Sequence, residues 1–258
     1  MLNDFIDSFF NSEVIFTALP AILSYGLWNT LVLALTSTAI GVVIGLVLAV
    51  FGVSRSWILR AIARVYTDVL RGLPAILTIL LVGLSLAAPL RGITGGNPYF
   101  LAILALSLIA GAYIGEIFRG GILAIDKGQM EASRALGMSY GASMRLVVVP
   151  QAARQVLPSL VNQFISIVKD TSLVYILGLI TTQRDLFRVG QDTAVQTGNL
   201  SPLVLAGLFY LVITVPLTHL VNFIDNRLRN GKPAKKVLDP EQDLKTAVVD
   251  ITGEERAR

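Results

Sequence analysis

Four long stretches of this chain contain no Asp, Glu, Lys or Arg, and they constrain the fold more than any other feature. A bilayer core about 30 Å thick is crossed by about 20 apolar helical residues. Hydrophobic residues make up 54% of the chain and charged residues only 15%, which is not the composition of a soluble globular domain. The stretches are Val14–Ser54, Gly72–Leu90, Gly92–Gly115 and Thr193–Asn222. The sequence therefore predicts membrane-spanning helices.

About five spans can be placed, so the expected fold class is an all-α polytopic membrane protein. In the first span, Gly41, Gly45 and Ala49 are spaced by four residues, which would let another helix approach this face closely. Gly72 and Pro74 interrupt the second span soon after it begins. The predicted spans are Trp28–Val53, Val69–Leu90, Pro98–Arg119, Leu157–Ile180 and Pro202–Phe223.

The two ends of the chain differ from the transmembrane domain, which is predicted to cover 26–228. Residues 1–25 contain several phenylalanines but no Lys or Arg, and we expect this segment to lie at the membrane interface. Residues 229–258 are polar and lack a helical apolar stripe, so they are expected to form a flexible tail.

Lys and Arg residues are distributed unevenly between the spans, and this predicts the orientation. Segment 54–71 carries four, segment 119–155 carries five and the tail from Asp225 carries eight. The other side has only Arg91, Arg184 and Arg188. Because short loops rich in Lys and Arg stay in the cytoplasm, the N-terminus is expected outside and the C-terminus inside. The connection between the third and fourth spans is then cytoplasmic.

Several classes of chemistry find no support in the residues. The chain has no cysteine, and His219 is its only histidine, so neither a metal site nor a Ser-His pair is expected. No Gly-x-x-x-x-Gly-Lys-Ser/Thr string occurs, so this chain should not bind ATP itself. The basic residues flank the spans, where they fix orientation more often than they bind nucleic acid.

The cytoplasmic connection at 126–150 has the pattern of two short helices. Good helix formers run from Glu131 to Leu136, and Gly137 offers a left-handed stop, after which a second short helix begins near Ser139. The small residues would let another protein approach closely, as in a docking helix. A solvated connector between spans is the other interpretation, and the residues alone leave both open.

The spacing within this connection resembles that of the EAA loop of ABC importer permeases. That family has Glu-Ala-Ala, three residues, Gly, nine residues and then Ile-x-Leu-Pro. Here Glu131-Ala132-Ser133 is followed at the same spacing by Gly137 and by Val147-Val148-Val149-Pro150. Flanking strings are similar to those of the polar amino acid branch: Asn29-Thr30, Arg71-Gly72-Leu73-Pro74, Glu116 to Gly121, Asn162-Gln163 and Lys169 to Leu173.

The resemblance implies a type I ABC importer permease fold and a set of partners. The 126–150 loop would hold the coupling helices that sit in a groove of a separate ATPase, which binds ATP and Mg. A second permease subunit, identical or paralogous, and an extracytoplasmic solute-binding protein would complete the importer in the inner (cytoplasmic) membrane. The residues expected to dock on the ATPase are Gly128, Glu131, Ala132, Ser133, Ala135, Leu136, Gly137, Arg145 and Pro150.

Lys169 and Asp170 are charges within the predicted fourth span, and a charge at membrane depth costs several kcal/mol unless it is paired or faces water. Adjacent residues on a helix point about 100° apart, so each needs its own partner. Glu116 could pair with Lys169, and Arg71 or Arg119 with Asp170. The ammonium and carboxylate of an amino acid could serve instead. The cluster is therefore either a substrate path or gate, or a structural clamp between helices.

Other polar or irregular positions could belong to the same path. Glu116 and Arg119 are three residues apart, a spacing that also suits a local pair finishing the third span. The break at Gly72 and Pro74 could expose backbone groups to substrate, or could be an ordinary helix start. The remaining candidates of the path are Asn162, Gln163, Thr171 and Ser172.

These observations favour a permease subunit that translocates polar amino acids and is not itself an enzyme. An ion-driven secondary amino acid transporter is the alternative, but it would prefer two related halves with helix breaks in corresponding positions. An intramembrane enzyme is a third class, against which the single histidine and the missing cysteines argue. The transported amino acid stays open among glutamate, glutamine, arginine, histidine and cystine.

Overall fold

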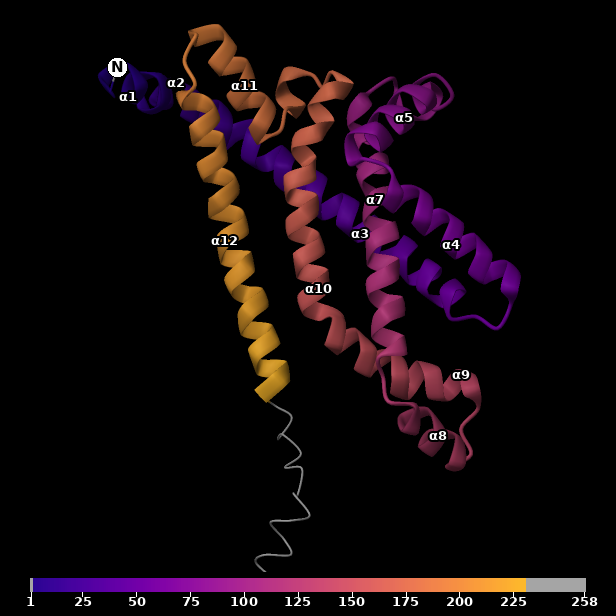
Figure 1. Cartoon of the computed structure of the whole chain (residues 1–258). Helices are drawn as coiled ribbons and strands as arrows, with labels where there is room; N and C mark the ends of the chain where they lie inside the picture. The colour runs from indigo at the N-terminus through magenta and orange to yellow at the C-terminus, as the bar shows by residue number, and fades with distance from the viewer. Residues whose placement is uncertain (1, 231–258) are drawn as a thin grey trace, which may run out of the picture. The chain divides into compact units, whose positions relative to one another are not determined.

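The computed structural model describes residues 2–230, and this part of the chain is helical without any strand (Figure 1). Residues 231–258, which include most of the predicted tail, lie outside the described residues. Contacts divide the chain into two units, Met1–Asn222 and Phe223–Arg258. The packing and the sites discussed below belong to the first unit.

The chain contains long apolar helices joined by short ones. The helices are α1 (Leu2–Phe10), α2 (Ser12–Ala21), α3 (Leu27–Gly52), α4 (Trp57–Gly72), α5 (Ala75–Ala87), α6 (Arg91–Thr94), α7 (Pro98–Leu123), α8 (Lys127–Ala135), α9 (Tyr140–Ser143), α10 (Val149–Asp170), α11 (Leu186–Thr197) and α12 (Ser201–Asn230). Turns of π-helix at Ile22–Gly26 and Met144–Val148 join α2 to α3 and α9 to α10, and turns of 3₁₀-helix cover Thr171–Leu177 and Thr181–Gln183.

Four continuous helical runs are long and apolar enough to cross a membrane, and a bent helix pair raises the number to five. The runs are Ile6–Gly52, Pro98–Leu123, Tyr140–Leu177 and Ser201–Arg227, and the bent pair is α4 with α5. The predicted all-α fold with about five spans is thereby confirmed. The run that contains α3 begins within the segment predicted to lie at the interface, since α2 continues into α3 without leaving helical geometry.

The second span differs from the continuous helix Val69–Leu90 that its hydropathy suggests. Helix α4 begins earlier, at Trp57, and ends at Gly72, and α5 follows at an angle of 108°. The cause is Pro74, because a proline forces the preceding residue out of helical geometry. Leu73 is accordingly extended, with φ −86° and ψ 142°.

The centre of the helix packing is the contact of α3 with α7, which depends on small residues. A Cβ atom at Gly45 would lie 2.8 Å from the backbone nitrogen of Gly115, and one at Gly41 would lie 2.5 Å from the Cβ of Ala110. Ala49, one turn further, is buried. The close approach predicted from the four-residue spacing is therefore confirmed, and its partner is α7.

Replacing Gly45 with valine should destabilise the folded chain by about 1–3 kcal/mol, since a larger side chain must push two packed backbones apart. Thermal unfolding of the purified chain in detergent measures this. Gly207→Val on α12 is the matched control, because a Cβ at Gly207 meets nothing within 4 Å. Equal losses of Tm in the two variants would contradict the packing role of Gly45.

The start of α3 is tied to the segment that precedes α11. The side-chain amide of Asn29 donates to the carbonyl oxygens of Thr182, at 2.9 Å, and Arg184, at 3.1 Å. The Leu186 amide donates to the hydroxyl of Thr30 at 3.0 Å. Buried backbone groups need such partners. Asn29 and Thr30 therefore hold the connection between α10 and α11 on α3.

Candidate functional site

Helices α8 and α9 connect α7 to α10 at the end of these two helices that lies away from α5 and α11 (Figure 1). Asp126 starts α8 because its carboxylate accepts a hydrogen bond from the Gly128 amide at 2.8 Å. A cation–π contact places the guanidinium of Arg55 5.2 Å from the Tyr140 ring centre. This contact links α9 to the turn between α3 and α4.

Gly137 ends α8 in the predicted left-handed conformation, with φ 85°. Its amide donates to the carbonyl of Arg134 at 3.0 Å, and the Met138 amide donates to the carbonyl of Ser133 at 3.2 Å. The Arg134 side chain also donates to the Met138 carbonyl, at 2.6 Å. These bonds satisfy carbonyl groups that the end of a helix leaves free. The stop predicted from the sequence is therefore confirmed.

The predicted docking residues are exposed, with one exception. Leu136 is 84% exposed. Ser133 is buried, and its hydroxyl donates to the Met130 carbonyl at 2.9 Å, so this side chain stabilises α8 from within. We define the coupling surface as the exposed residues Gly128, Glu131, Ala132, Ala135, Leu136, Gly137, Arg145 and Pro150.

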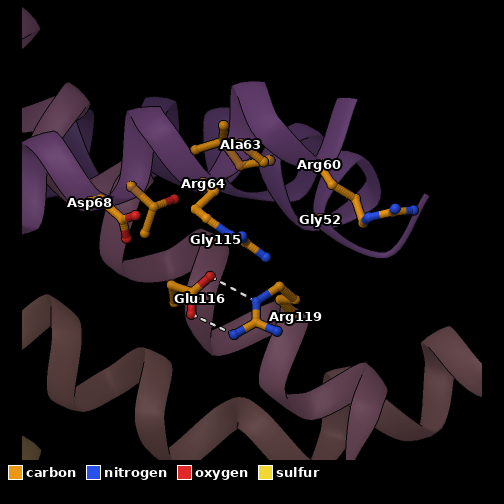
Figure 2. A pocket seen from close by; sticks show the side chains of 10 residues that line it. Gly52, Arg60, Ala63, Arg64, Asp68, Gly115, Glu116 and Arg119 are labelled. Atoms are coloured by element: carbon orange, nitrogen blue, oxygen red, sulfur yellow. Dashed lines mark hydrogen bonds and ion pairs between the residues drawn. The ribbon is translucent and has the colours of Figure 1, made fainter. Parts of the chain in front are cut away.

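A second group of predicted residues meets around Glu116 (Figure 2). The Arg119 guanidinium donates two hydrogen bonds of 2.8 Å to the Glu116 carboxylate, which is the local pair expected from their spacing. Arg71, at the end of α4, places a terminal nitrogen 3.7 Å from the same carboxylate. Its guanidinium also lies 5.2 Å from the Tyr113 ring centre. The structure thus brings Arg71, Glu116 and Arg119 together.

Lys169 and Asp170 lie elsewhere, at the end of α10. In residues 2–230 no ion pair joins either of them to the group around Glu116. Helices α7 and α10 run antiparallel, and Ile114 and Val168 belong to one core cluster between them. The partners suggested from the sequence are therefore not joined as ion pairs in this packing of the described helices.

The other predicted path residues are placed as follows. Lys169 is exposed and Asp170 is partly buried. The hydroxyls of Thr171 and Ser172 donate to the carbonyls of Val168 and Lys169, at 2.8 and 2.7 Å, so both bind the helix end. Asn162 is exposed and Gln163 partly buried, on α10, while Gly72 and Pro74 are exposed at the bend between α4 and α5.

Comparison with known proteins identifies the protein family of this chain. The sequence profile of the binding-protein-dependent transport system inner membrane components matches residues 41–230, which include the coupling surface. The chain belongs to this family. It is 37% identical over 213 residues to the arginine transport system permease protein ArtQ of Bacillus subtilis (strain 168), covering 83% of this chain and 94% of that protein.

Other relatives agree with this permease family. The glutamine transport system permease protein GlnP of Escherichia coli (strain K12) is 33% identical, with 85% of this chain and 98% of that protein covered. The crystal structure of an amino acid ABC transporter with histidines matches with a TM-score of 0.72 and 31% identity, covering 83% of this chain and 96% of that chain. The predicted type I ABC importer permease fold is thereby confirmed.

Sequence reasoning missed Asp185, a fully buried carboxylate of the permease at the start of α11. It accepts hydrogen bonds from the Phe187 amide, at 3.0 Å, the Arg188 amide, at 3.4 Å, and the Tyr210 hydroxyl, at 3.1 Å. Burial raises the pKa of the Asp185 carboxyl to about 6, although these hydrogen bonds lower it. An Asp immediately before a helical pattern is an N-cap signal that could have indicated it.

The stability of the permease should therefore fall as the pH rises from about 4 to about 6. The Asp185 carboxyl has an ordinary pKa of 3.8 and a pKa of about 6 in the folded chain. Between these values the folded state holds a proton that the unfolded state has lost, so a rising pH favours unfolding. The difference corresponds to about 3 kcal/mol. Thermal unfolding from about pH 4 to about pH 7.5 measures it.

Two variants test whether Asp185 causes this dependence. Asp185→Asn removes the titrating group and should flatten the change of Tm with pH. Tyr210→Phe removes a hydrogen bond that favours the carboxylate, so the fall should extend to a higher pH. A pH profile that Asp185→Asn leaves unchanged would assign the effect to other groups.

Proposed function

We propose that this chain is the permease subunit of an ABC importer that translocates polar amino acids across the cytoplasmic membrane. The observation that carries the proposal is the coupling surface. In a chain of this permease family, the residues that resemble the EAA loop form an exposed helix that ends at a left-handed glycine and presents Leu136. A solvated connector has no need of small residues, a defined helix break and a Pro-bounded end over this stretch.

The substrate class is supported by the names of the relatives. They are permease proteins for arginine, for glutamate and aspartate, and for glutamine. These amino acids share only the zwitterionic backbone and a polar side chain. The proposed path therefore includes the group around Glu116 and the residues Lys169 and Asp170, which together offer both signs of charge for a zwitterion.

The partners follow from this function. A separate ATPase dimer, which holds ATP and Mg, binds the coupling surface on the cytoplasmic side. A second permease subunit, identical or paralogous, encloses the path, and an extracytoplasmic binding protein delivers the amino acid. This requires the N-terminus outside and the C-terminus inside, as the distribution of Lys and Arg supports.

Reconstitution tests the proposal. The chain is placed in liposomes with the partner ATPase and binding protein of the same importer. A thermal-shift screen of the binding protein selects the amino acid, and uptake of that labelled amino acid is followed. Uptake should require ATP and should persist when ionophores collapse the ion gradients. Uptake that proceeds without ATP and stops with the ionophores would support the ion-driven alternative, which the relatives disfavour.

A further inference from the structure

A polar pocket of about 200 Å³ lies between α3, α4 and α7, and the path described above uses only one edge of it (Figure 2). Arg60, Arg64 and Asp68 line the pocket from α4, and Glu116 and Arg119 line it from α7. The α4 residues follow one another at four-residue spacing, so they form a stripe on one face of the helix. The Arg64 side chain of this stripe points toward Glu116 and Arg119, whereas the Arg60 guanidinium turns toward the carbonyls of Ser54 and Arg55.

The charges in this pocket do not balance. Three guanidinium groups and two carboxylates line the pocket. The Arg60 guanidinium donates to the carbonyls of Ser54 and Arg55, at 2.8 Å each, and Glu116 is held by Arg119 through two hydrogen bonds. Arg64 has neither an ion pair nor a hydrogen bond with any other described residue, and Figure 2 shows its guanidinium directed into the pocket. The surplus is one positive charge, which matches a ligand with one negative charge.

Helix α4 carries a second exposed stripe, which is apolar. Ile58, Ile62, Val65 and Val69 are all more than half exposed. At 100° per residue they lie about 120° around the helix from the charged stripe. A helix with adjacent charged and apolar exposed faces suits the boundary between lipid headgroups and acyl chains.

The pocket also lies at the level of a membrane interface. Gly52 is the last residue of α3, Arg60 lies in the first turn of α4, and Arg119 lies one turn before the end of α7. Trp57, at the start of α4, is 72% exposed, as expected of a tryptophan at the headgroup level. Basic pockets between helices at this level suit anionic headgroups.

We propose that this pocket binds the phosphodiester group of an anionic phospholipid. The Arg64 guanidinium holds the phosphate, and Nη1 of Arg119, which takes no part in the pair with Glu116, is its second donor. The acyl chains cover the apolar stripe of α4. A bound lipid then fixes α4 against α7 on the side where the coupling surface is attached. Free phosphate and the carboxylate of a transported amino acid could bind the same two guanidinium groups. The test therefore distinguishes these two ligands from the lipid phosphodiester.

The tryptophan content of the chain makes the test specific. Trp28 and Trp57 are the only two tryptophans, and Trp28→Phe leaves the one beside Arg60. The full chain is reconstituted in phosphatidylcholine, and quenching of Trp57 by brominated phosphatidylglycerol is compared with quenching by brominated phosphatidylcholine. Phosphatidylglycerol should bind with at least about fivefold preference, the factor expected for one basic residue at the membrane surface.

Arg64→Gln should abolish most of this preference, and Arg64→Lys should retain part of it. The control is Arg55→Gln, which removes the same charge two residues from Trp57 but outside the pocket, and which should keep the preference within about twofold. Equal losses in Arg64→Gln and Arg55→Gln would mean general surface attraction and overturn the site. Loss of the preference on adding inorganic phosphate, or on adding arginine, glutamate or glutamine, would assign the pocket to those ligands instead.

Discussion

Gly137→Asp should lower both amino acid uptake and permease-stimulated ATP hydrolysis by at least about tenfold, while the chain still inserts in the membrane. A Cβ at Gly137 meets nothing within 4 Å in the isolated chain, so the space around it is open until a partner binds. An unpaired carboxylate buried against that partner costs several kcal/mol, and 1.4 kcal/mol is already tenfold in affinity. Copurification of the ATPase with the permease measures the loss directly.

The control for Gly137→Asp is Gly198→Asp. Gly198 also ends a helix in the left-handed conformation, with φ 65°, and a Cβ there also meets nothing within 4 Å, but it follows α11 rather than α8. The two variants share their backbone strain and their new charge. Copurification reduced equally in both would show that strain, not docking, causes the loss.

Glu131→Lys tests the same surface without altering the backbone. Glu131 is exposed on α8, six residues before Gly137, so the folded chain should tolerate the change. Reversal of a charge at an interface places like charges together and costs several kcal/mol. The variant should therefore lose ATPase copurification while its Tm stays within about 1 °C of that of the unchanged chain. A normal ATPase rate would contradict the assignment.

Contacts next to the coupling surface join α8 and α9 to the membrane-spanning helices. Tyr140 stacks on Arg55, in the turn from which α4 begins, and the Gln151 side chain donates to the Gln129 side chain at 3.2 Å, joining α10 to α8. A displacement of α8 and α9 is therefore passed both to α4 and to α10. These helices carry Arg71 and Lys169, the charged residues of the proposed path.

The number of apolar helices could be predicted from the sequence, because a charge-free stretch of about 20 residues suits the hydrocarbon core. The Gly137 stop could be predicted as well, since it depends only on local backbone chemistry. The bend between α4 and α5 could be predicted only in part. Pro74 marks the break in the helix, but no local signal sets the angle of 108° between the two helices. Hydropathy also gives no helix rotation or register.

The packing of α7 against α10 decides which of the charged residues suggested as partners form ion pairs. Lys169 follows Val168, and Glu116 lies two residues after Ile114 of the same cluster, yet no ion pair joins Lys169 to Glu116 in residues 2–230. The four-residue spacing of Arg60, Arg64 and Asp68 places them on one face of α4, and this follows from the sequence alone. The packing of that face against Arg119 of α7 does not follow from the sequence. Pairing across helices depends on packing between residues far apart in the chain.

Asp170→Asn should lower uptake by about tenfold to a hundredfold, the factor for a lost hydrogen bond between charged groups of about 1.5–3 kcal/mol. Asp170 is partly buried beside the exposed Lys169, and neither has a protein ion-pair partner among the described residues, which leaves both for a zwitterionic substrate. ATP hydrolysis and ATPase copurification should persist, in contrast to Gly137→Asp, because the coupling surface is untouched.

Stability separates this path role from the structural clamp. If Asp170 held two helices together, Asp170→Asn would lower the Tm of the purified complex and its yield along with uptake. If it contacts the substrate, the Tm should stay within about 2 °C, and Asp170→Glu should recover part of the uptake because the charge is retained. Unchanged uptake with normal expression and assembly would remove Asp170 from the path. Substrate recognition in the membrane would then fall to the charged group at Glu116, which Glu116→Gln would test.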